Sequence, residues 1–162
     1  MGARHPSTLT VARHSLEPFE FDPTMVTERV PNMGTKENAE LVRRGYEAFS
    51  AGDMATLGEV FAADAVWHVA GRSVLAGKKQ GRDAILGYFG EMGTRSGGSL
   101  KVTVQEIIAG ENRTVALQHT EAENNGKNMD ADGALAFQIR DGKISEVREF
   151  FDDTAKGDAF WA

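Results

Sequence analysis

The sequence predicts an α+β domain in which helices come first and an antiparallel sheet follows. Apolar residues recur at helical spacing as far as the glycine pair 97–98, and from Leu100 onward they alternate with polar residues, as in a half-buried strand. Asp141-Gly142 lies between two such alternating runs and is a strong signal for a tight hairpin turn. Helices and strands that are segregated in this way favour an α+β sheet over alternating βαβ units.

Three helices are expected before this sheet. The first begins at a Thr35 cap and stops at Gly52, and Asp53 caps a shorter second helix. The third opens at residues 81–83 and ends at the glycine pair 97–98. Apolar spacing predicts that the second helix turns inward Met54, Leu57, Val60 and Phe61. Across the three helices, the side chains expected to be buried against the sheet are Phe49, Phe61, Ile85 and Phe89.

One strand is expected before the third helix and four after it. The β-branched and aromatic run 65–69 predicts the first strand, and the segment rich in Gly, Lys and Gln that follows is expected to be a loop. The later strands are expected at residues 100–108, 113–123, 134–140 and 143–151. Because side chains alternate along a strand, one face of the second of these would carry Val115, Leu117, His119 and Glu121.

The composition excludes several classes of protein. The chain of 162 residues has a net charge of −6 and no cluster of Lys and Arg, which argues against binding nucleic acid or an anionic membrane. It contains no cysteine, so disulfides and thiolate ligands are excluded, and no His-x-His spacing indicates a metal site. Because the sequence shows neither a secretory signal nor an apolar stretch of ~20 residues, a cytoplasmic location is expected.

Residues 1–34 differ from the rest of the chain. They contain all four prolines and show no sustained helical or strand period, although a short apolar patch lies within residues 19–26. We expect them to form an N-terminal arm, either partly flexible or docked through this patch, and residues 35–162 to form one domain.

Three phrases carry a resemblance to a known family. They are FAADAVWH at residues 61–68, LAG to GRDAI at 75–85, and RDGKI to FFD at 140–152. In this order of elements they resemble the SnoaL-like branch of the nuclear-transport-factor-like superfamily, which includes ketosteroid isomerase, limonene epoxide hydrolase and polyketide cyclases. The resemblance implies a cone-shaped α+β barrel, in which a curved, mainly antiparallel sheet and three N-terminal helices surround a pocket. It also implies a homodimer and chemistry without cofactor or metal.

The resemblance suggests four acid–base candidates. The position of the isomerase's aspartate falls on Val69 or His68, so no carboxylate is present there, and His68 is either a substitute base or a structural histidine. Aligned with the epoxide hydrolase, the last-strand carboxylate falls on Glu149, and the pair spaced i, i+2 falls on His119 and Glu121. The alternative for Glu149 is an exposed ion pair with a neighbouring strand, and the alternative for His119 and Glu121 is a solvated or dimer-facing strip of the sheet.

An apolar wall for the pocket is expected from Trp67, Tyr46, Tyr88, Leu135, Phe137 and Phe151. The expected ligand is a small hydrophobic molecule such as a polyketide, a terpenoid or a steroid-like compound. The expected activity is cofactor-free acid–base chemistry: epoxide hydrolysis, cyclisation, isomerisation or dehydration. The alternative is a non-catalytic small-molecule-binding protein or a dimeric accessory protein.

Overall fold

The structure is a computed structural model that describes residues 33–162. It contains four helices, which are α1 (Met33–Ala51), α2 (Met54–Val60), α3 (Arg82–Arg95) and α4 (Thr154–Trp161). It also contains six strands, which are β1 (Phe61–Val69), β2 (Gly77–Gln80), β3 (Lys101–Ala109), β4 (Thr114–Asn124), β5 (Lys127–Arg140) and β6 (Lys143–Phe151). The arm predicted over residues 1–34, with its apolar patch, lies almost entirely outside the described residues.

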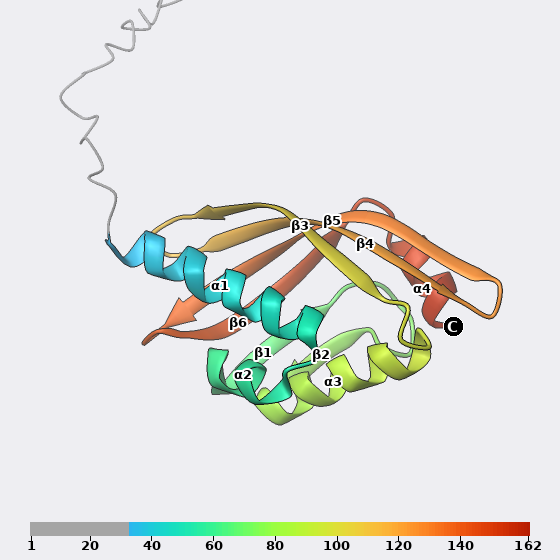
Figure 1. The fold of residues 1–162 in the computed structure, drawn as a ribbon, viewed down its shortest axis with the longest axis horizontal. Helices are drawn as coiled ribbons and strands as arrows, with labels where there is room; N and C mark the ends of the chain where they lie inside the picture. Colours follow the sequence, from blue (N-terminus) through green and yellow to red (C-terminus); the bar gives the residue numbers. More distant parts are fainter. Residues whose placement is uncertain (1–32) are drawn as a thin grey trace, which may run out of the picture. The chain divides into compact units, whose positions relative to one another are not determined.

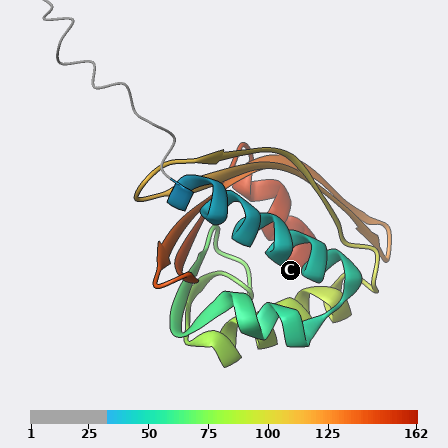
Figure 2. The ribbon, with the colours of Figure 1, turned by 60° about the vertical axis from the view of Figure 1, so that its left-hand side comes forward.

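The six strands form one sheet in the order β2-β1-β6-β5-β4-β3 (Figure 1). Neighbouring strands run antiparallel, except that β1 and β6 are parallel. The sheet bends over α1, and α2 and α3 lie on the same concave side (Figure 2). Among the described residues the sheet does not close, because β2 and β3 remain its two edges. The α+β prediction is therefore confirmed, with an open curved sheet in place of a closed barrel.

Short-range signals account for most of the element boundaries. Gly52 has a positive φ of 66° and ends α1, and the Asp53 carboxylate caps α2 by accepting a hydrogen bond from the Thr56 N–H at 3.0 Å. At the predicted hairpin turn, Asp141 and Gly142 both have positive φ, 53° and 72°, as a type I′ turn requires. These local predictions hold because each depends on only a few neighbouring residues.

Several features differ from the prediction. Helix α1 begins at Met33, so Thr35 lies inside its first turn, and the expected loop after β1 contains the short edge strand β2. The two lysines of β2 suit an edge strand that must resist pairing with other chains. A fourth helix, α4, follows the sheet and is capped by the Asp153 carboxylate. Phe61 belongs to β1 rather than to the second helix, and Met54 is 42% exposed rather than inward-facing.

The core lies between the helices and the concave side of the sheet, which we call the inner face. Phe61, Ile85 and Phe89 are buried there as expected, whereas Phe49 is only partly buried. On β4 the buried residues are the alternate set Thr114, Ala116, Gln118, Thr120 and Ala122. The predicted set with Val115 and Leu117 therefore lies on the outer face. Within residues 33–162, no helix is long and apolar enough to cross a membrane.

Candidate functional site

A pocket of about 120 Å³ lies between the inner face of the sheet and the helices. Its walls are mainly apolar, because most of the strands that border it turn aliphatic or aromatic side chains inward, whereas β4 contributes Gln118 and Thr120. The six side chains predicted as an apolar wall all line it: Trp67, Tyr46, Tyr88, Leu135, Phe137 and Phe151. Further large apolar contributions come from Phe49, Phe89, Met92, Met129 and Trp161. The charged residues in the lining are Glu149, Asp153 and Asp158.

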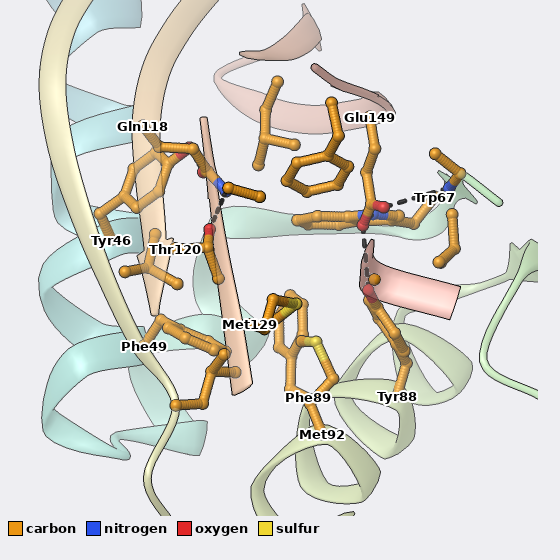
Figure 3. A pocket seen from close by; sticks show the side chains of 18 of the residues that line it. Tyr46, Phe49, Trp67, Tyr88, Phe89, Met92, Gln118, Thr120, Met129 and Glu149 are labelled. Atoms are coloured by element: carbon orange, nitrogen blue, oxygen red, sulfur yellow. Dashed lines mark hydrogen bonds between the residues drawn. The ribbon is translucent and has the colours of Figure 1, made fainter. Parts of the chain in front are cut away.

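Glu149 projects into this pocket from β6 (Figure 3). Its Oε1 accepts hydrogen bonds from the Trp67 indole N–H at 2.7 Å and from the Tyr88 hydroxyl at 3.0 Å. Its Oε2 accepts one hydrogen bond, from the Ala70 backbone N–H at 3.1 Å. The carboxylate is therefore held in one orientation by donors from β1, from the residue that follows β1, and from α3.

Pairing within the sheet explains why these groups meet. Glu149 lies opposite Leu135 of β5, and it shares the inner face of β6 with Val147 and Phe151. The parallel pairing of β1 with β6 places Trp67 opposite Val147, so the indole lies beside the Glu149 side chain. Tyr88 reaches the same carboxylate from α3, which packs on β1.

Burial determines the proton affinity of this site. It raises the pKa of Glu149 above the ordinary value of a glutamate, and the hydrogen bonds from Trp67, Ala70 and Tyr88 and the charge of Lys79 oppose this rise only in part. Burial, and next the negative charge of Glu149, raise the pKa of Tyr88 well above its usual range. Tyr88 therefore stays a hydrogen-bond donor, while Glu149 takes up a proton more readily than an exposed glutamate does.

A second polar group lies on the opposite wall, where α1 faces β4 (Figure 3). The Tyr46 hydroxyl donates to Gln118 Oε1 at 2.6 Å, and Gln118 Nε2 donates to Thr120 Oγ1 at 3.2 Å. Burial, and next the charge of Glu149, raise the pKa of Tyr46, so it too remains a protonated donor. Sequence reasoning did not identify Gln118 and Thr120. The available signal was their i, i+2 spacing on one face of β4, opposite the face that carries His119 and Glu121.

The other predicted acid–base residues do not join Glu149. His119 and Glu121 lie on the outer face of β4, where His119 Nδ1 is 2.8 Å from Asp132 Oδ1 and Glu121 is 3.5 Å from Lys101. The hydrogen bond with Asp132 is the main cause that raises the pKa of His119. The predicted grouping of these two residues with Glu149 is therefore wrong. Alternation defines which residues share a face, but it does not say which face is buried.

His68 is also absent from the pocket lining. Its Nε2 lies 3.1 Å from Glu146 Oε1, and this glutamate accepts a further bond from Arg148. Of the two roles expected for His68, a substitute base or a structural histidine, the structure therefore fits the second. On the outer face, His119, Glu121 and Asp130 bring ligand-type atoms within 4.8 Å of one another, but both carboxylates are exposed, and exposed acidic groups are common without a metal.

Helix α4 and the residues after β1 form the remaining edge of the pocket. Asp158 of α4 accepts hydrogen bonds through one oxygen from the backbone N–H groups of Arg72 and Ser73, at 2.7 and 2.8 Å. Gly71 is closely fitted here, with a φ of 90°, and a Cβ atom at this position would lie 2.3 Å from the Asp158 carboxylate. Asp158, Ser73 and Trp161 all line the pocket.

Residues 42–147 match the SnoaL-like domain family, and the chain belongs to this family. Members of the family often bind small molecules and catalyse cyclisation or isomerisation. An uncharacterized protein of Mycobacterium tuberculosis is 32% identical over 124 residues, which cover 76% of this chain and 95% of the relative.

Solved structures agree with this assignment. Bal32a, from a soil-derived mobile gene cassette, is 39% identical, and the match covers 79% of this chain and 98% of Bal32a with a TM-score of 0.77. TerC, crystallised with polyporic acid, shares the fold at 23% identity, with a TM-score of 0.68 over 78% of this chain and 99% of TerC.

Proposed function

We propose that the protein binds a small uncharged hydrophobic molecule in this pocket and that Glu149 moves a proton on it without a cofactor. The observation that carries the proposal is the position of Glu149, a carboxylate with a raised pKa among aromatic side chains. In the described part of the chain, the charged residues of the lining are all acidic, so a carboxylate or phosphate ligand would find no cationic partner there. The complex of TerC, which shares the fold, with an organic ligand supports this use of the pocket.

The hydrogen bonds indicate which oxygen reacts. Oε1 already accepts two hydrogen bonds, from Trp67 and Tyr88, whereas Oε2 accepts one, from Ala70. Oε2 therefore has the free lone pair that takes a proton from a C–H or O–H group of the substrate, and the electron pair of the broken bond stays on the substrate. Return of the proton to another substrate atom gives an isomerisation, and attack of the substrate anion on a carbonyl carbon gives a cyclisation.

A two-carboxylate epoxide hydrolysis is less well supported. Glu121 and His119, which would complete such a set, lie on the other face of the sheet. The two other acids of the lining have structural partners: Asp153 caps α4, and Asp158 binds the backbone of residues 72 and 73. The reactions that remain are those that one carboxylate can carry out.

The hydrogen bonds of Glu149 also support a second candidate function, that of a small-molecule-binding protein without catalytic activity. Three donors hold the Glu149 carboxylate, and this pattern would also serve to fix the architecture of a passive pocket. The two functions differ in one respect: only the enzyme requires Glu149 to titrate and to exchange protons with a bound molecule.

We also propose that the protein is a homodimer formed through the outer face of the sheet. Ile108 and Phe150 are 51% and 57% exposed, which is unusual for such large apolar side chains. Pairing places Val115 between Ile108 and Ala136, and Leu117 and Phe150 both beside Ala134. The exposed apolar residues therefore form one patch across four strands. The cysteine-free sequence supports a cytoplasmic location for this dimer.

Proton exchange on a simple ketone tests the enzyme proposal. 2-Indanone is uncharged and carries acidic C–H groups beside its carbonyl, so a base in the pocket would exchange them for deuterium in D₂O, which NMR measures. We expect the wild-type protein to accelerate this exchange and Glu149→Gln to lower the acceleration about a hundredfold or more. Glu121→Gln is the matched control, because it makes the same change on the outer face. Binding of 2-indanone without accelerated exchange would favour the passive pocket.

A further inference from the structure

The wall opposite Glu149 contains hydrogen-bonding groups that the proposed proton transfer does not use. Gln118 and Thr120 are each only 5% exposed, although one side chain is an amide and the other a hydroxyl. Burial of such groups is unfavourable unless they are hydrogen-bonded, so their partners can be counted. They lie next to each other on the inner face of β4, and both line the pocket.

The protein satisfies these groups only in part. Gln118 Oε1 accepts from Tyr46, and one of the two Nε2 hydrogens of Gln118 goes to Thr120 Oγ1. Within residues 33–162, no protein acceptor pairs with the second Nε2 hydrogen or with the hydroxyl hydrogen of Thr120. Two neutral donors from adjacent inward positions therefore remain available to a molecule in the pocket.

We propose that Gln118 and Thr120 form a second subsite, which binds an uncharged hydrogen-bond-accepting oxygen of the ligand, such as a carbonyl oxygen. Donors without charge suit a neutral acceptor, and Glu149 on the facing wall disfavours an anion. Tyr46 is a positioning residue: its hydroxyl holds Gln118 Oε1, which directs the amide nitrogen toward Thr120. The inference deepens the proposed function and rests on the ligand occupying the same pocket.

The subsite defines a class of substrate. A molecule that spans the pocket presents its oxygen to Gln118 and Thr120 and a C–H or O–H group to Glu149 (Figure 3). Burial, and next the charge of Glu149, raise the pKa of Tyr46, so Tyr46 remains a protonated donor that can hold Gln118 in place. Two polar contacts on opposite walls, with apolar walls between them, hold a ligand in one orientation. The substrate class is thus an uncharged, ring-containing ketone or a related oxygen compound.

Two probes of nearly the same shape test the subsite. 2-Indanone carries a carbonyl group where indane carries a methylene, so the ratio of their dissociation constants reports the contact with the oxygen. We expect the wild-type protein to prefer the ketone by about tenfold, the value of one ordinary hydrogen bond. Gln118→Met and Thr120→Val, which keep the size of each side chain, should each bring the ratio close to one. Tyr46→Phe should lower it in part.

The ratio of the two dissociation constants distinguishes loss of the contact with the ligand oxygen from general loosening of the pocket. A loosened pocket would bind both probes less well and leave the ratio unchanged. Thr103→Val is the control for Thr120→Val, since Thr103 is an exposed threonine on the outer face of the neighbouring strand. It should leave the ratio at its wild-type value. Circular dichroism would show whether each variant is folded.

The test also distinguishes this inference from the proposed function. A ketone preference that depends on Gln118, without Glu149-dependent proton exchange, would support the subsite and overturn the catalytic proposal. The opposite outcome is proton exchange on 2-indanone that depends on Glu149, with the ratio of dissociation constants unchanged in Gln118→Met and Thr120→Val. This outcome would overturn the subsite alone. Equal wild-type affinity for the two probes, or no binding of either, would also overturn the subsite.

Discussion

The two faces of the sheet differ in the kind of polar residue they carry. On the inner face of β4, Gln118 and Thr120 are neutral, buried and hydrogen-bonded within an apolar pocket. On the outer face of the same strand, His119 and Glu121 are charged or chargeable and pair with other exposed side chains. Adjacent residues of one strand thus lie in different environments. On the inner face a hydrogen bond is strong because little water is present, and on the outer face water and salt weaken the ion pairs.

The same contrast applies to the two glutamates. Glu149 is half-buried in the pocket wall, is held by three donors and has a raised pKa, whereas Glu121 is exposed and lies 3.5 Å from a lysine. In the sequence both look equally suited to acid–base chemistry. The packing around them, not the residue type, separates the candidate catalytic group from the surface charge, and substitutions matched across the two faces can test this distinction.

Phenylalanines on the two faces should give the largest difference. Phe137 is buried on the inner face, so Phe137→Ala should lower the free energy of unfolding by ~3–5 kcal/mol, because it leaves a cavity in the core. Phe150 is 57% exposed on the outer face, and Phe150→Ala should cost less than about 1 kcal/mol. Urea denaturation at a protein concentration where the chain is monomeric measures both. Similar losses in the two variants would contradict the assignment of the faces.

The raised pKa of Glu149 predicts a pH dependence of stability. The folded state holds this proton more tightly than the unfolded state, so the stabilising contribution is complete below the unfolded pKa and is lost as pH rises through the folded pKa. Above that point the wild-type protein carries the cost of a buried charge. Glu149→Gln does not titrate, and its free energy of unfolding relative to wild type should increase as pH rises through this range.

Urea denaturation at several pH values measures this difference. Glu121→Gln, the exposed counterpart, should follow the wild-type curve through the same range. If Glu149→Gln also followed the wild-type curve, the carboxylate would not be desolvated as its surroundings indicate.

Much of the fold follows from local signals in the sequence. Gly52, Asp53 and the Asp141-Gly142 turn specify backbone geometry through their own side chains or the lack of one, and the structure confirms all of them. Strand β2 was missed because Gly77–Gln80 has little strand propensity of its own, and it forms a strand by pairing with β1. Tertiary pairing of this kind leaves no periodic pattern in the sequence.

The candidate site was predictable only in part. Glu149 and the apolar wall were identified by resemblance and by residue type, and the structure places them together. The sequence left open which face of β4 lines the pocket, and Val115 and Leu117, on the outer face, are more hydrophobic than Gln118 and Thr120. The usual rule that the apolar face is buried fails where the inner face lines a polar subsite and the outer face has an apolar patch.

The outer patch leads to the third prediction, a homodimer that depends on it. The wild-type protein should sediment at about twice the chain mass of 17.6 kDa at micromolar concentration. Phe150→Asp or Leu117→Asp places a charge in the patch and should weaken association by at least about thirtyfold, as loss of a central apolar contact does. Glu149→Gln, on the other face, should leave the mass unchanged. A wild-type monomer at these concentrations would contradict the dimer.

The smallest expected effect concerns the edge of the pocket formed by α4. Asp158 joins this helix to the backbone N–H groups of Arg72 and Ser73, and the contact is close because residue 71 is a glycine. Asp158→Asn keeps the shape but replaces a charged acceptor with a neutral one, which should weaken the contact by about 1 kcal/mol. Hydrogen exchange of the Arg72 and Ser73 amides should then become about fivefold faster, and bound 2-indanone should dissociate faster by a similar factor, because both require this edge to open. Asp152→Asn is the control, since Asp152 is exposed just before α4. Faster amide exchange with unchanged ligand dissociation would show that ligands leave by another route, and unchanged amide exchange would show that Asp158 does not hold this edge closed.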